Sequence, residues 1–312
     1  MERNKVTRQR EFMKTTITLN VIQTDKFSTV EIADAIEAAF GEFDRIVKRF
    51  TRFNEDSELS NLNRNSGNWV KVTPEMFMLV EKMLKLSQTT DGAFDPTVID
   101  FLETYGYDPN YDFSKLDNPD LDNMVKNLAD TRPSWREIEL DKENHALKLA
   151  PKQHLDLGGI GKGYAIDLAF DILKKFGHVL IDAGGDLRAI GHNENDEEWQ
   201  LAMKHLAKGQ NPADAQIIGV IKTDNLALAC SGSWARKVKQ FHHIIDPRTG
   251  KPTEEMQTVY VTAPTATEAD SWATALFVGG KDLLEKLPEG MNALLIYPDN
   301  KAIHTSDFPE FN

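Results

Sequence analysis

Short strand-like segments crowd the second half of this 312-residue chain and constrain its fold more than any other feature. Each is an apolar or alternating run bounded by polar or glycine-containing turns, which is the pattern of a β-strand. Because no regular helical crossovers separate them, we expect an α+β fold with mostly antiparallel sheet rather than a doubly wound parallel sheet. The segments are HVLID (178–182), WQLAM (199–203), IIGVIKT (217–223), ALACS (227–231), FHHIID (241–246), TVYVTA (258–263), NALLIYP (292–298) and a short strand near Ala302.

Helices are expected where capping residues precede runs with helical periodicity. Ser28 with Glu31 forms a capping box, and Thr265 with Glu268 forms another. The other expected elements of the core are a strand at 15–22, a helix from Thr73 through Leu84 and a helix at 163–177, with a polar loop at 51–63.

No Pro- or Gly-rich linker divides the chain, so we expect a single domain over residues 12–312 after an N-terminal extension of residues 1–11. Residues 107–135 are rich in Asp, Asn and Pro and have weak periodicity. We interpret them as a surface insertion that holds one short helix.

Charge and cysteine content exclude several classes of protein. The net charge of −13 argues against a nucleic-acid partner or an anionic membrane partner, which usually brings a basic patch. Cys230 is the only cysteine, so an intramolecular disulfide and a metal site of several thiolates are excluded. The basic N-terminus lacks the apolar core of a signal peptide, and no stretch has the length of a membrane helix. We therefore expect a cytoplasmic protein, although a secreted form whose leader was removed would have the same sequence.

The segment LDLGGIGKGYAID (155–167) is the first candidate binding element. Glycines at 158, 159, 161 and 163 precede the expected helix, and Lys162 lies among them. Glycine allows close approach of the backbone, and a helix N-terminus offers free N–H groups, so the segment suits a phosphate or pyrophosphate. It is not a Walker A loop, because Gly163 follows the lysine where Ser or Thr is required. A tight strand-to-helix turn with a solvated lysine explains the segment equally well.

The helix that follows Thr265 carries the second candidate. Asp270 and Thr274 are four residues apart, so both oxygen-bearing side chains project from one face of a largely apolar helix. A buried carboxylate must be paired, hydrogen-bonded or bound to a metal, and carboxylate and hydroxyl oxygens suit Mg²⁺. The alternative is that Asp270 only complements the dipole of its own helix.

Histidines and aromatic residues supply weaker candidates. His242 and His243 lie in the expected strand 241–246 and should point to opposite faces, so an inward histidine would be available as a general base. A lone strand histidine is nevertheless more often structural. Phe53 and Phe94 each stand in a polar loop and would flank a planar ring, unless these loops serve only as turns.

The motifs of the chain, taken in order from about Phe12 to Gly280, resemble the motif set of the ApbE family. Members of that family are FAD:protein FMN transferases, and the resemblance implies a T-fold-related α+β fold with mostly antiparallel sheets flanked by helices. Met13-Lys14-Thr15 replaces the common Met-Gly-Thr start of the family. The motifs are SELSNLN, DGAFDPT, LDLGGIGKGYAID, LIDAGGDLRAIG, SGSWAR, HHIIDPRTGKP and ATEADSWATALFVGG.

The resemblance also implies roles for single residues. Asp270, Thr274 and the carbonyl of Gly159 match the magnesium ligands, and His243 matches the histidine that activates the acceptor hydroxyl. Asp270 thereby counts with His243 as catalytic. The residues that match positions lining the FAD are Met13, Phe53, Asn54, Asp95, Lys162, Ser231 and the backbone of Ile244.

The reaction implied by the resemblance is Mg²⁺-dependent transfer of FMN from FAD to a Thr or Ser hydroxyl of an acceptor flavoprotein of the reductase type, with release of AMP. The backbone N–H groups of 158–163 would hold the pyrophosphate. Two alternatives remain open. The same residues serve a Mg²⁺-dependent FAD pyrophosphatase, in which water replaces the acceptor, and a non-catalytic FAD-binding protein would need only the pocket.

Overall fold

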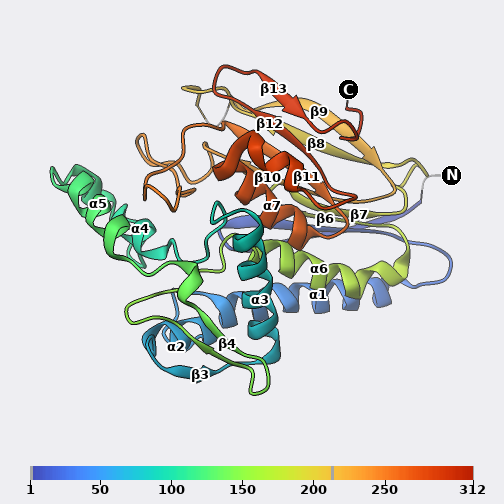
Figure 1. Ribbon diagram of the computed structural model, residues 1–312. Helices are drawn as coiled ribbons and strands as arrows, with labels where there is room; N and C mark the ends of the chain where they lie inside the picture. Colours follow the sequence, from blue (N-terminus) through green and yellow to red (C-terminus); the bar gives the residue numbers. More distant parts are fainter. Residues whose placement is uncertain (1–2, 212–213, 312) are drawn as a thin grey trace.

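An eight-stranded antiparallel sheet forms the centre of the computed structural model, which describes residues 3–211 and 214–311. The strand order is β1-β2-β6-β7-β10-β11-β12-β13, so segments from both ends of the chain lie in one sheet (Figure 1). The strands are β1 (Lys5–Phe12), β2 (Thr15–Ile22), β6 (Val179–Ala183), β7 (Asp186–Ile190), β10 (Asn225–Gly232), β11 (Thr258–Ala263), β12 (Asn292–Ile296) and β13 (Ala302–His304).

Three long helices cover one face of this sheet: α1 (Thr29–Phe50), α6 (Gly161–Leu173) and α7 (Ala266–Gly279). Ile17 and Leu19 of β2 alternate with polar residues and are fully buried in the core beneath these helices. The capping box expected before α1 is present at Ser28 and Glu31. Before α7, Thr265 caps the helix by accepting from the N–H of Glu268, but the Glu268 carboxylate bonds the Thr265 hydroxyl instead of its backbone N–H, so the reciprocal box is not formed.

A two-stranded sheet of β8 (Trp199–His205) and β9 (Gln216–Thr223) covers the opposite face. Leu187, Tyr260 and Leu294 of the main sheet pack there with Trp199 and Ile221. Because both faces are covered, every residue of β11 is buried, including the polar Thr258 and Thr262. The mixed helices and antiparallel sheets confirm the α+β prediction.

The remaining elements lie away from the main sheet. The segment expected as a surface insertion, 107–135, packs with α4 around a separate apolar cluster that includes Phe101, Tyr105 and Val125. The elements are α2 (Glu58–Arg64), α3 (Pro74–Thr89), α4 (Ile99–Thr104), α5 (Leu121–Thr131), a small sheet of β3 (Trp69–Lys71), β5 (Ala146–Lys148) and β4 (Glu139–Asp141), and short 3-10 helices at Phe113–Asp117, Trp135–Glu137, Lys174–Phe176 and Gly280–Lys286.

The structure differs from the sequence prediction in three segments: the N-terminal residues, the polar loop at 51–63 and the histidine-containing segment 241–246. Residues 5–11, which were expected in an N-terminal extension, form β1 together with Phe12 at the sheet edge, where only Val6 is buried and no apolar alternation marks a strand. The loop at 51–63 contains α2. The strand expected at 241–246 is wrong, because the His242 ring bonds the nearby backbone of Thr253 and Ile244 in place of a ladder.

None of the helices in the described part of the chain has both the length and the apolar character needed to cross a bilayer.

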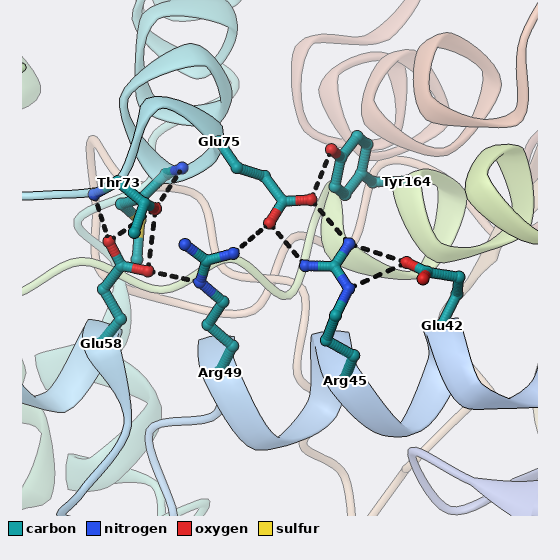
Figure 2. A network of polar contacts seen from close by, with 8 residues as sticks. Glu42, Arg45, Arg49, Glu58, Thr73, Glu75 and Tyr164 are labelled. Carbon is teal, nitrogen blue, oxygen red and sulfur yellow. Dashed lines mark hydrogen bonds and ion pairs between the residues drawn. The ribbon is translucent and has the colours of Figure 1, made fainter.

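A network of charged side chains ties α1, α3 and α6 together (Figure 2). Glu75, in the first turn of α3, accepts hydrogen bonds from Arg45 Nη1 (2.7 Å) and Nη2 (2.8 Å), from Arg49, and from the hydroxyl of Tyr164 (2.8 Å). The hydrogen bonds from Arg45 are the main cause that lowers the pKa of Glu75. Tyr164 belongs to the first turn of α6, so the network fixes the start of that helix. Its labelled members are Glu42, Arg45, Arg49, Glu58, Thr73, Glu75 and Tyr164.

Replacing Glu75 with alanine should lower the free energy of unfolding by about 2–3 kcal/mol at pH 7, because Arg45, Arg49 and Tyr164 lose a shared acceptor. Glu42→Ala is the matched control: Glu42 contacts only Arg45 in this network, and its loss should cost about 0.5 kcal/mol. Urea unfolding measures both values.

The difference between the wild type and Glu75→Ala should also depend on pH. A carboxyl whose pKa is lowered by folding stabilises the protein above its ordinary pKa of 4.5 and loses that contribution as the pH falls through the folded value. Equal losses in the Glu75 and Glu42 variants, or a difference that persists under strongly acidic conditions, would contradict this account.

Candidate functional site

The glycine–lysine turn leads directly into α6, and its glycines serve close packing. A Cβ atom on Gly163 would lie 2.3 Å from the carbonyl oxygen of Ala266, so α6 and α7 cross at backbone contact. Several amides of the turn are already bonded internally: Gly158 N to Asp156 Oδ2 (2.8 Å) and Gly161 N to the carbonyl of Leu157 (2.7 Å). The amide groups that the sequence analysis assigned to the pyrophosphate are therefore largely engaged.

Asp270 lies against this turn. Its Oδ2 accepts a hydrogen bond from the N–H of Gly163 (2.9 Å), and its Oδ1 lies 4.0 Å from Nζ of Lys162. Asp270 is 7% exposed, so this carboxylate is buried between two helix starts. It caps the neighbouring helix rather than only complementing its own, and it joins two segments that are 107 residues apart in sequence.

The bond to Asp270 changes the environment of Gly159. In a regular helix the N–H of Gly163 would bond the carbonyl four residues earlier, which belongs to Gly159. Here Asp270 takes that donor, and within residues 3–211 and 214–311 no hydrogen bond to the Gly159 carbonyl is found. Gly159 also lies close to α7, since a Cβ built on it would be 3.6 Å from Cγ2 of Thr274.

Thr274 is the third residue at this contact between α7 and the glycine–lysine turn. Its side chain is partly exposed, and its hydroxyl makes no hydrogen bond within the described residues, whereas Ser271 on the same helix donates to the carbonyl of Thr267 (2.8 Å). The Gly159 carbonyl, Asp270 Oδ1 and the Thr274 hydroxyl are hard oxygen donors, which fit Mg²⁺. No group of three or more His, Cys, Asp or Glu side chains forms a metal site in the described part of the chain, so phosphate or water oxygens would have to complete the coordination.

Lys162 is held by a second carboxylate that sequence reasoning missed. Its ammonium group contacts Oδ2 of Asp186, which is 1% exposed, and Oδ1 of Asp186 accepts from the N–H of Cys230 (3.1 Å). Burial lowers the pKa of Lys162, and the charge of Asp270 opposes that effect. Asp186 follows the glycine pair of LIDAGGDLRAIG, and an acid directly after a tight strand turn was the available signal.

His243 lies in a loop rather than a strand, yet the two neighbouring histidines still differ in role. Nδ1 of His243 lies 3.1 Å from the carbonyl of Ala235 and must therefore donate to it, which leaves Nε2 as an acceptor. Burial, followed by the charge of Arg236, lowers the pKa of His243 to about 3, so its ring is neutral at physiological pH. The ring of His242 is bonded to the backbone on both sides and is structural.

The tip of the β1–β2 hairpin lies beside this loop. The carbonyl of Met13 accepts from Arg236 Nη2 (3.2 Å), and the carbonyl of Arg236 accepts from the hydroxyl of Tyr107 (2.7 Å). The ring of Tyr107 is 6.5 Å from that of His243. Met13 and His243 therefore belong to one neighbourhood, and Lys162 is close enough for its charge to act on His243.

Other predicted residues occupy different environments. Phe53 is 47% exposed, and its ring centroid lies 5.8 Å from that of Tyr111, so an aromatic surface is available there. Asn54 is exposed and accepts from the N–H of Asp56 (3.1 Å). Ser231 is buried in β10, next to Cys230 in the sequence.

Asp95 and the backbone of Ile244 already make hydrogen bonds within the protein. Asp95 Oδ2 bonds Arg132 (2.8 Å), and Oδ1 accepts from the N–H (2.8 Å) and hydroxyl (2.6 Å) of Thr97. The N–H of Ile244 donates to His242 (3.2 Å), and its carbonyl accepts from Thr253 (3.2 Å). Asp95 thus fixes the end of the insertion, and His242 and Thr253 hold the backbone of Ile244.

Surface grooves lie elsewhere. A groove of about 910 Å³ lies over α1, α2 and the turn before α3, and a second of about 370 Å³ lies beside Trp234 and His242. Neither groove, in the part of the chain that the structure describes, is lined by Lys162, Asp270 or Thr274. The candidate metal ligands and Lys162 therefore lie outside both grooves.

Comparison with known proteins gives a consistent result. An FAD:protein FMN transferase of Haemophilus influenzae is 29% identical over 292 residues, covering 86% of this chain and 82% of the relative. One from Treponema pallidum is 29% identical over 304 residues, covering 89% and 81% respectively.

Solved structures agree in fold. The ApbE protein of Thermotoga maritima superimposes with a TM-score of 0.83 at 28% identity and covers 97% of both chains, which confirms the ApbE-like fold. The flavin transferase ApbE of Vibrio cholerae gives a TM-score of 0.82 at 22% identity over 98% of both chains and supports the fold alone. The model of the ApbE family matches residues 13–295, which is nearly the whole of this chain. The chain therefore belongs to the ApbE family.

Proposed function

We propose that this chain is a Mg²⁺-dependent FAD:protein FMN transferase that attaches FMN to a Thr or Ser hydroxyl of an acceptor flavoprotein of the reductase type. Membership of the ApbE family and the names of its relatives support flavin transfer from FAD. The observation that carries the proposal is the contact of Asp270 with the glycine–lysine turn. It gathers an acid, a lysine, and a hydroxyl and a carbonyl that have no hydrogen-bond partner among the described residues.

Oxygen donors of α7 and of the turn before α6 would hold the metal ion. They are Asp270 Oδ1, the Thr274 hydroxyl and the Gly159 carbonyl, and oxygens of the pyrophosphate and water would supply the remaining ligands. When bound, Mg²⁺ neutralises the charge that develops on the pyrophosphate as the phosphoanhydride breaks.

Lys162 supplies a second positive charge for the pyrophosphate. Its contact with Asp186 keeps the ammonium group near Asp270. Because few amides of the turn are free, we assign recognition of the pyrophosphate mainly to Lys162 and the metal ligands.

His243 is the proposed general base. Its Nε2 accepts the proton of the acceptor hydroxyl while the hydroxyl oxygen forms a bond to the phosphorus of the FMN half, and the bond from that phosphorus to AMP breaks. AMP leaves with the electron pair of the broken bond. The hydrogen bond from Nδ1 to Ala235 keeps the ring in the tautomer that this step requires.

Transfer is tested by incubating the protein with FAD, Mg²⁺ and an acceptor flavoprotein. We expect the acceptor to gain the mass of one covalently bound FMN and AMP to be released in equal amount. Free FMN and AMP that form equally fast without the acceptor would favour a pyrophosphatase. A yellow protein without Mg²⁺-dependent turnover would favour an FAD carrier.

Asp270→Ala should abolish Mg²⁺-dependent transfer, because it removes a metal ligand and also frees the Gly163 amide. Ser271→Ala is the matched control, since its hydroxyl bonds only carbonyls of α7, and activity should stay within about twofold of wild type. Measured transfer rates over a range of Mg²⁺ concentrations check both variants. Full activity of Asp270→Ala would remove the metal assignment.

His243 should remain neutral well below its ordinary pKa of 6.5, because burial lowers its pKa. The base is then present throughout the neutral and mildly acidic range, and its ring resonances should not titrate between about pH 8 and 5. An NMR titration, with His243→Ala used to assign the signals, measures this. The same variant should lose about 10²–10⁴-fold in transfer rate. A His243 titration near pH 6.5 would contradict the assignment.

A further inference from the structure

The first turn of each of the helices α6 and α7 donates backbone hydrogen bonds to a carboxylate of the other helix. Asp270 of α7 accepts from the N–H of Gly163 in the first turn of α6 (2.9 Å). In return, Asp167 of α6 accepts from the N–H of Ala266 (2.8 Å) through Oδ1 and from the N–H of Thr267 (2.9 Å) through Oδ2. The Thr267 hydroxyl also donates to Oδ2. Each helix therefore caps the other.

Helix α7 does not need Asp167 in order to begin. Thr265 is its own N-cap, since the hydroxyl accepts from the N–H of Glu268 (3.2 Å) and donates to the Glu268 carboxylate (2.7 Å). Asp167 bonds the two preceding amides of α7, which the local cap leaves without a partner. What Asp167 adds is a link between the helices.

The link lies on the faces that carry the site. Gly163 and Asp167 are four residues apart on α6, as Ala266 and Asp270 are on α7, so each pair shares one face. Gly163 contacts Ala266 at backbone distance, and two bonds from one carboxylate restrict rotation of α7 at that contact. A shift of α7 would move Asp270 away from the Gly163 amide.

From this geometry we propose that Asp167 is a positioning residue for the metal site, which fixes Asp270 and Thr274 against the glycine–lysine turn by capping α7 from α6. The inference rests on the proposed function, because it takes Asp270 and Thr274 as metal ligands. The negative charge of Asp167 suits the positive end of the α7 dipole.

A Mn²⁺ titration followed by EPR, at saturating ADP, tests this role. ADP carries the adenosine and pyrophosphate of FAD but has no FMN to transfer, so the readout is metal affinity rather than turnover. Asp167→Asn keeps the size of the side chain but cannot accept from both amides, and the Kd of Mn²⁺ should rise about 10-fold or more.

Thr265→Ala is the matched control for helix stability. It removes the cap of α7 itself and should lower the melting temperature, yet it leaves the link from Asp167 intact. Its Kd for Mn²⁺ should stay within about twofold of wild type, a change well below that expected from loss of a residue supporting a metal ligand.

Each outcome decides the matter. If the wild type binds Mn²⁺ and Asp167→Asn binds it equally well, or if Thr265→Ala weakens binding to the same extent, the positioning role is wrong and the proposed function is untouched. If the wild type with ADP binds no Mn²⁺, the metal assignment of the proposed function fails, and this inference fails with it. Should Asp167→Asn not fold, Thr267→Val removes only the hydroxyl bond to Asp167, and its Kd should rise about threefold; an unchanged Kd would overturn the role.

Discussion

The candidate site depends on one hydrogen bond, from the N–H of Gly163 to Asp270. A carboxylate that is 7% exposed is costly unless it is paired, and this one is paired with an amide at the positive end of α6 and with Lys162 nearby. The same bond takes the amide that would otherwise satisfy the Gly159 carbonyl. One interaction thus joins α6 to α7, leaves one oxygen of Asp270 available and frees a carbonyl beside Thr274.

The rest of the fold holds that contact in place. The eight-stranded sheet supports α6 and α7 on one face (Figure 1). Its β6–β7 turn leads to Asp186, which contacts Lys162. The network around Glu75 fixes the first turn of α6 through Tyr164 on the side of α1 and α3 (Figure 2). The β1–β2 hairpin and the insertion meet the loop of His243 through Arg236 and Tyr107. Elements from the whole chain therefore hold the neutral His243, Lys162 and the buried Asp186 in position.

Local sequence patterns predicted much of this fold. Features that depend on partners distant in the sequence could not be predicted from such patterns. Alternation marked β2, and capping boxes marked α1 and α7, because these signals lie within a few residues. The edge strand β1 has no apolar alternation, and the His242 ring replaces a strand ladder at 241–246, so neither could be seen from periodicity. Asp270 was identifiable as an acid on an apolar helix, whereas the partner of Asp95 is Arg132, 37 residues away, and no local pattern reveals such a pairing. Asp167 was missed for the same reason, and the place of Asp186 after the glycine pair did not reveal that its partner is Lys162.

The proposed transfer requires one divalent cation bound between α7 and the turn before α6. A crystal structure of the protein with Mn²⁺ and ADP, with anomalous differences recorded for manganese, tests this requirement. We expect one manganese peak within about 2.0–2.4 Å of Asp270 Oδ1, the Thr274 hydroxyl and the Gly159 carbonyl, with Lys162 against the ADP phosphates. A pyrophosphate bound in this corner with its manganese ligated by other side chains, or a peak remote from α7, would contradict it.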